Sequence, residues 1–175
     1  MQSTEDAMTR GFARILVPTD FSPPSDAALA TAKALAAQFG ASIHMIHVLL
    51  DPYATAAYAS DVYGYVPPGL KEAWQREAQT HLDAQLTPAE RAQFRATTRV
   101  VFGTPARAIV DYARENAINL IVMGTHGRGA VAHLLLGSVA ERVVRTADCP
   151  VLTVRGIEAA LATLSTEAEP ARVAV

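Results

Sequence analysis

The chain has little of several features that mark whole classes of protein. It contains one cysteine, Cys149, which excludes an internal disulfide and is typical of a reducing cytoplasm. Charged residues make up 18% of the chain and the net charge is −2, with no basic block, so nucleic acid is not expected as a partner. No apolar run approaches the ~20 residues of a membrane-spanning helix. Residues 1–10 lack the apolar centre of a secretory signal, and we expect them to form a flexible, polar N-terminus.

The two most familiar phosphate-binding signatures are also absent. No G-x-x-x-x-G-K-[ST] segment is present, which excludes a P-loop. No G-x-G-x-x-G segment follows the first expected strand, which excludes the usual dinucleotide fingerprint. A phosphate site in this chain must therefore be built in another way.

What the sequence does have is a regular alternation of expected strands and helices. Its 175 residues, of which 50% are hydrophobic, suit one domain with a sizeable core. The expected strands are 13–18, 42–49, 95–102, 120–123 and 150–154. Helical patterns follow over 23–39, 70–86, 105–116 and 138–147, with a short turn after Thr87. This alternation predicts βαβ units and a parallel sheet covered by helices on both faces.

Two segments do not fit this alternation. Residues 51–69 hold four of the five tyrosines and are too long for an ordinary connection. They fit a tolerated surface insertion, and also a lid or contact surface in which tyrosine serves as an amphipathic anchor. The helix after them places Trp74 on the same side as Ala78 and Leu82. The alanine-rich tail 156–175 is expected to be a short helix or a frayed end.

The most informative stretch lies between the fourth expected strand and the last helix. Gly124 is followed after two residues by Gly127, and after nine more by Gly137 and Ser138. Glycine lets backbone N–H groups approach a ligand with no Cβ in the way, and a helix start adds unpaired N–H donors and a partial positive charge. This combination predicts a phosphate-binding turn. The same residues also fit ordinary turn glycines and a capping box between Ser138 and Glu141, neither of which needs a ligand.

A second loop is expected at the same edge of the sheet. It reads Pro18-Thr19-Asp20-Phe21-Ser22 and enters a helix for which Ser22 is the candidate N-cap. If the strand order reverses at the first strand, both loops leave the carboxyl ends of neighbouring strands, where open α/β sheets bind ligands. The convergence favours a nucleotide site. Asp20 can accept a hydrogen bond from a ribose hydroxyl or an adenine amino group, and its alternative role is to cap the helix.

Four other polar residues fit more than one role. Arg128 fits either a phosphate partner or a solvated loop charge. His126 lies inside the glycine stretch and is a general-base candidate with no evident partner to orient it. His44 and His47 alternate with apolar residues on the second strand, and we interpret them as hydrogen-bonded histidines rather than metal ligands.

These features together resemble the universal stress protein family, in its ATP-binding branch. Four segments carry the resemblance: the first strand and turn (15–22), the fourth strand and turn (120–127), the G-x2-G-x9-G-[ST] pattern, and the closing strand (149–154). The likeness covers about residues 11–155 and leaves the tyrosine-rich segment and the tail without a clear counterpart. It implies an α/β fold with a single doubly wound domain, whose five-stranded parallel sheet has the order 3-2-1-4-5 with helices on both faces.

The resemblance also implies which residues bind the nucleotide. The ribose and phosphates would lie against Gly124, Gly127, Gly137 and Ser138, with Met123, His126 and Val139 in the same site. The adenosine side would be formed by Pro18, Thr19 and Asp20, with Val48 as an apolar wall for adenine. A divalent cation, Mg²⁺ or Mn²⁺, would be held by the phosphates rather than by protein ligands. No residue is assigned as catalytic or as a metal ligand.

The expected function is that of a cytoplasmic ATP-binding stress-response or signalling module with an unknown protein partner. We expect at most slow ATP hydrolysis, and a homodimer formed through residues 150–154, because an uncharged edge strand is a template for pairing. One alternative is an enzyme that activates substrates with ATP; the loop 19–22 argues against it, because such enzymes usually carry a Ser-Gly-Gly-rich loop there. The other alternative is a nucleotide-free interaction module, against which the intact glycines argue.

Overall fold

The computed structural model describes residues 11–51, 67–125 and 136–155. The predicted flexible N-terminus, most of the tyrosine-rich segment, His126, Gly127, Arg128 and the tail lie outside the described residues. The strands are β1 (Arg14–Pro18), β2 (Ser42–Leu49), β3 (Thr97–Phe102), β4 (Leu120–Gly124) and β5 (Val151–Val154). The helices are α2 (Pro23–Phe39), α4 (Leu70–Ala84), α5 (Pro88–Gln93), α6 (Pro105–Glu115) and α7 (Ser138–Thr146).

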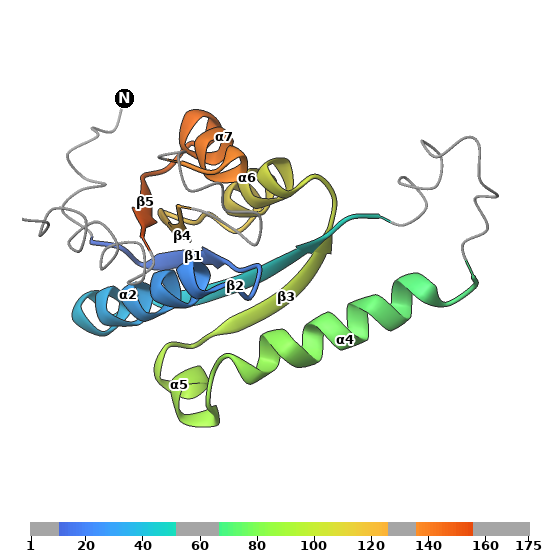
Figure 1. Ribbon diagram of the computed structural model, residues 1–175. Helices are drawn as coiled ribbons and strands as arrows, with labels where there is room; N and C mark the ends of the chain where they lie inside the picture. The colour runs from blue at the N-terminus through green and yellow to red at the C-terminus, as the bar shows by residue number, and fades with distance from the viewer. Residues whose placement is uncertain (1–10, 52–66, 126–135, 156–175) are drawn as a thin grey trace, which may run out of the picture.

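The five strands form one parallel sheet in the order β3-β2-β1-β4-β5 (Figure 1). This confirms the predicted order, with β1 in the middle. The chain first winds outward from β1 to β3 and then crosses back to β4 on the other side of β1. The carboxyl ends of β1 and β4 are therefore neighbours at the point where the winding reverses, which is where ligands bind in sheets of this kind.

Alternate residues of each strand enter two separate apolar clusters, one on each face of the sheet. On β1, Ile15 and Val17 pack with α2 and α4, whereas Leu16 packs with α6 and α7. Figure 1 shows α2 and α4 on one side of the strands, with α6 and α7 on the other. The central strands β1 and β4 are buried on both faces in this way, which explains why they are nearly continuous apolar runs.

The helix boundaries follow the local signals. Helix α2 begins after the N-cap Ser22 with prolines in its first turn, and ends at Gly40, whose φ of 65° lies in the left-handed region that favours glycine. Helix α5 begins with a capping box between Thr87 and Glu90. A hydrogen bond from Lys33 of α2 to Glu90, 2.7 Å long, connects the two helices and is the main reason that the pKa of Glu90 falls to about 2.

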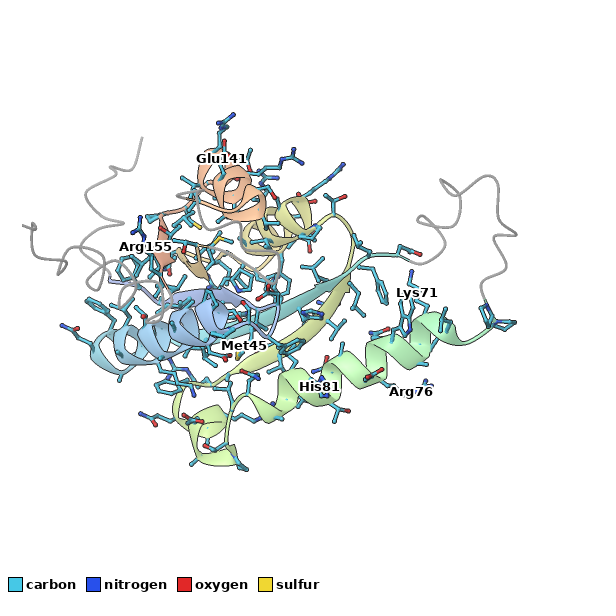
Figure 2. All side chains as sticks on the ribbon, in the orientation of Figure 1. Met45, Lys71, Arg76, His81, Glu141 and Arg155 are labelled. Atoms are coloured by element: carbon cyan, nitrogen blue, oxygen red, sulfur yellow. The ribbon has the colours of Figure 1, made fainter. Side chains whose placement is uncertain are left out.

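Helix α4 packs against the sheet over only part of its length. Ala78 and Leu82 are buried as expected, but Trp74 is 41% exposed. The first turns of α4 project past the ends of β2 and β3, where Lys71 pairs with Asp51 at 2.6 Å (Figures 1 and 2). The helical spacing of apolar residues predicts which side of α4 faces the sheet. It does not predict that Trp74, on that side, lies beyond the end of the sheet. No helix in the described ranges has both the length and the apolar character to cross a membrane.

Candidate functional site

The loop between β1 and α2 is held by a network of buried hydroxyl groups. Thr19 Oγ1 lies 3.0 Å from Ser25 Oγ and accepts the N–H of Phe21, also at 3.0 Å. Ser25 Oγ in turn donates to the carbonyl oxygen of Ser22 at 2.7 Å and accepts its N–H at 3.0 Å. Because these polar groups are buried and bonded to one another, the loop has one preferred shape.

Asp20 lies within this loop and is half-buried. Its Oδ1 accepts the Ser22 hydroxyl at 2.5 Å and the Ser22 N–H at 3.2 Å. The N-cap of α2 is Ser22. The alternative interpretation of Asp20 as that N-cap is therefore wrong. The carboxylate has a fixed orientation at the carboxyl edge of the sheet, and a carboxylate there can accept hydrogen bonds from hydroxyl or amino groups of a ligand.

Strand β2 contributes residues of different character on its two faces. Val48 is half-buried and packs against the apolar cluster of α6 and α7. His47, on the other face, lies with Nδ1 2.8 Å from the carbonyl oxygen of Thr19. His44 Nδ1 lies 3.1 Å from the hydroxyl of Tyr112 on α6. Both histidines are hydrogen-bonded, as predicted, and the described residues contain no cluster of three or more metal-ligating side chains.

Gly124 ends β4 against the first turn of α2. A Cβ at this position would lie 2.9 Å from the carbonyl carbon and the Cβ of Pro24, and 3.0 Å from its oxygen. There is no space for a side chain, so packing alone explains this glycine. The contact also places the start of α2 directly beside the end of β4, so that the two predicted loops leave adjacent points of the sheet.

Two backbone hydrogen bonds of Thr125, the residue after β4, hold the start of the connection between β4 and α7. Thr125 donates its N–H to Val154 of β5 at 2.9 Å and accepts the N–H of Gly137 at 2.7 Å. The second bond joins the residue that follows β4 to the residue that precedes α7. The N–H of Gly137 already has a backbone partner, so its predicted contact with phosphate does not involve that group.

Helix α7 begins differently from the expected capping box. Gly137 is the N-cap and Ser138 is the first helical residue, while Glu141 pairs with Arg145 at 2.7 Å. The capping-box interpretation of Ser138 is therefore wrong. Gly137 has no side chain that could accept the N–H groups of the first turn, those of Ser138, Val139 and Ala140. Such groups have no partner within the helix and carry its partial positive charge.

Three predicted apolar site residues belong to one cluster on the α6 and α7 face. Met123 is buried there, and Val48 and Val139 pack against it from β2 and α7. The described part of the predicted site thus combines an apolar surface, a carboxylate acceptor at Asp20 and backbone donors at the start of α7. This set of groups matches the chemistry of an adenine nucleotide, whose base has flat apolar faces, whose ribose donates hydrogen bonds and whose phosphates accept them.

Sequence reasoning missed the roles of Pro24, Thr125 and His47. The packing of Pro24 on Gly124 joins residues a hundred positions apart, and local patterns carry no signal for it. Thr125 lies within the glycine stretch, and no local pattern indicates its bonds to Val154 and Gly137. His47 did have a signal: strict alternation along β2 places it on the face opposite to Val48, next to the β1–α2 loop.

A separate pocket of about 220 Å³ lies between the C-terminal half of α6 and the segment that joins α7 to β5. Its lining residues are Val110, Ala113, Arg114, Ala117, Ile118, Asp148 and Cys149. Burial first, and the neighbouring Asp148 second, raise the pKa of the Cys149 thiol, which favours the neutral thiol over the nucleophilic thiolate. The pocket is at the amino ends of the strands and contains none of the predicted site residues.

Both a family sequence model and individual protein sequences match this chain. The sequence model of the universal stress protein family matches residues 11–155. The chain belongs to the universal stress protein family. It is 36% identical to the universal stress protein MJ0531 of Methanocaldococcus jannaschii over 145 residues, which cover 82% of each chain.

Solved structures of the family share the fold. The structure of MJ0577, a universal stress protein of Methanocaldococcus jannaschii, superimposes with a TM-score of 0.67 at 27% identity, covering 82% of this chain and 96% of the other. A universal stress protein solved in complex with cAMP gives a TM-score of 0.53 at 28% identity, covering 83% and 98%. The family fold is thus observed with an adenine nucleotide bound in at least one relative.

Proposed function

We propose that the chain is an ATP-binding universal stress protein that acts as a nucleotide-dependent stress-response or signalling module in the cytoplasm and not primarily as a catalyst. The observation that carries this proposal is the contact between Gly124 and Pro24, which brings the β1–α2 and β4–α7 connections together where the sheet reverses its winding. The related complex with cAMP supports an adenine nucleotide as the ligand class.

Each part of the proposed site has a defined role. Asp20 accepts hydrogen bonds from the ribose or the adenine amino group, and Val48 with Met123 forms the apolar wall. The first-turn N–H groups of α7, beginning at Ser138, bind phosphate oxygens. Gly127 and the neighbouring His126 complete the phosphate side by family resemblance. Mg²⁺ or Mn²⁺ binds with the phosphates, which supply oxygen ligands of the kind that these hard cations prefer.

The proposed module works as a homodimer that presents a nucleotide-ordered surface to a protein partner. Strand β5 is an edge strand, and its residue Leu152 is 38% exposed. Val154 accepts the N–H of Thr125 inside the sheet, so the backbone groups of the alternate residues Val151 and Thr153 face outward. Antiparallel pairing of two such edges would give a two-fold dimer. Thr153→Pro removes one outward donor, and sedimentation should then show a monomer; a persisting dimer would point to another interface.

Mass spectrometry of the supernatant released by heating the purified protein tests the ligand class. ATP is the expected product, whereas an acyl-adenylate or AMP would favour the substrate-activating enzyme. Calorimetric titration of the nucleotide-free protein with ATP and Mg²⁺ should show one saturable site per chain. A protein that releases no nucleotide and gives no binding heat would contradict the proposal and favour the nucleotide-free interaction module.

A further inference from the structure

His47 holds the backbone of the β1–α2 loop from the neighbouring strand. Its Nδ1 lies 2.8 Å from the carbonyl oxygen of Thr19, and because a carbonyl can only accept, this nitrogen carries the proton and donates. The N–H of Thr19 is bonded to the carbonyl oxygen of Ile46 at 2.9 Å. Strand β2 thus satisfies both backbone polar groups of Thr19, one through its own backbone and one through the His47 ring.

The same ring supports the residue on the other side of Asp20. The rings of His47 and Phe21 have centroids 4.5 Å apart and planes tilted by 36°. Phe21 has a φ of 62°, in the left-handed region that residues with a Cβ rarely adopt. His81 of α4 meets the Phe21 ring edge-on, with the ring centroids 5.9 Å apart. Packing of the Phe21 ring therefore maintains an otherwise unfavourable backbone conformation.

One side chain consequently contacts both neighbours of Asp20 in the sequence. We infer that His47 is a positioning residue for nucleotide binding: it fixes the β1–α2 loop so that the Asp20 carboxylate is oriented toward the ligand. His47 acts through the loop, because its side chain is on the face of β2 opposite to the Val48 wall. The inference rests on the proposed nucleotide site and adds to it a residue outside that site.

His44 offers a matched comparison on the same strand. It too has Nδ1 near one oxygen, the hydroxyl of Tyr112, at 3.1 Å. It is half-buried like His47, but its partner Tyr112 belongs to α6 and packs on the face of the sheet opposite to Phe21. Replacement of His44 therefore removes a histidine and its hydrogen bond from β2 without altering the support of Asp20.

The test compares His47→Leu, His47→Asn and His44→Leu with the wild type. The side-chain amide of asparagine can place an N–H close to the position of Nδ1–H, so His47→Asn retains the donor to Thr19. We expect His47→Leu to weaken ATP binding about tenfold in calorimetry, and His47→Asn to recover most of that loss. His44→Leu should bind ATP as the wild type does.

Amide hydrogen exchange of the nucleotide-free proteins gives a second, independent readout. The Phe21 N–H, which donates to Thr19 Oγ1, should exchange faster in His47→Leu than in the wild type, but not in His44→Leu. Equal ATP affinity in all four proteins, equal losses in His47→Leu and His44→Leu, or unchanged exchange at Phe21 would each overturn the inference while leaving the proposed function intact. A wild type that does not bind ATP would instead overturn the proposed function and, with it, the inference.

Discussion

The two connections that meet at the carboxyl edge of the sheet are built in opposite ways. The β1–α2 loop is filled by side chains: Thr19, Ser22 and Ser25 are buried and bonded to one another. The β4–α7 connection is fixed by backbone contacts at its ends, the bond from Gly137 to Thr125 and the close packing of Gly124. We interpret the first as the part that shapes the adenosine side, and the second as the part that supplies donors to phosphate.

The comparison also shows that the glycines of one motif can be required for different physical reasons. Gly124 has no room for a Cβ because Pro24 occupies that space. Gly137 is the N-cap of α7 with an ordinary φ of −69°, so backbone strain does not require glycine there. For Gly137 we propose contact with the ligand as the reason, and for Gly127 the family resemblance implies the same. Substitutions at these positions should therefore separate stability from affinity.

The largest expected effect is at Gly127. In the proposed site, a Cβ there displaces the phosphate and costs two or more charge-assisted hydrogen bonds, each worth about 1.5–3 kcal/mol. Gly127→Ala should weaken ATP binding roughly a hundredfold or more, and should abolish the rise in melting temperature caused by ATP. The melting temperature of the nucleotide-free protein should change little. Thermal unfolding with and without ATP measures both, and a wild-type ATP shift in this variant would argue against the phosphate-binding turn.

Gly124→Ala should have the reverse effect, lowering the stability of the nucleotide-free protein more than its affinity for ATP. The added methyl group meets the backbone of Pro24, so α2 or β4 must move, and such overpacking costs about 1–3 kcal/mol. Chemical denaturation of the nucleotide-free protein should show this loss of stability. If the variant were as stable as the wild type but unable to bind ATP, Gly124 would be a ligand contact rather than a packing residue.

The fold was largely predictable from the sequence, and the site only in part. Apolar runs separated by helical patterns identified all five strands, and family resemblance supplied the confirmed strand order. The reason for Gly124 was not predictable, because it lies in a contact with Pro24 made only in the folded chain. The capping box at Ser138 was wrong because a serine three residues before a glutamate fits both the N-cap and the first helical position. The exposure of Trp74 was not predictable either, because helical periodicity does not indicate where the sheet beneath the helix ends.

Ser138→Ala should also separate stability from ATP affinity, with a smaller effect than the glycine substitutions. Because Gly137 rather than Ser138 is the N-cap, loss of the hydroxyl should leave the free energy of unfolding within about 0.5 kcal/mol of the wild type. In the proposed site the hydroxyl makes one hydrogen bond worth about 1 kcal/mol, so ATP affinity should fall about fivefold. Calorimetry and denaturation of one preparation measure both quantities. Unchanged affinity would remove the Ser138 side chain from the site.

The smallest expected effect is on the pH dependence of stability and does not involve the proposed nucleotide site. Burial first, and the Arg14 guanidinium second, lower the pKa of His44 below its ordinary value of 6.5. In the unfolded chain His44 takes up a proton near pH 6.5, while in the folded chain it stays neutral to lower pH. Stability is therefore lost as the pH falls below 6.5. Denaturation at a series of pH values should show a shallower loss in His44→Gln; an equal slope in both proteins would exclude this contribution.

The most direct test of the central claim is a crystal structure of the chain grown with ATP and Mg²⁺. The account predicts density for the nucleotide at the carboxyl edge of the sheet, with adenine against Val48, a polar contact to Asp20 and the phosphates at the first turn of α7. ATP bound at another place, such as the pocket beside Cys149, would contradict the proposed site. So would an empty edge in crystals of a protein that calorimetry shows to be saturated with ATP.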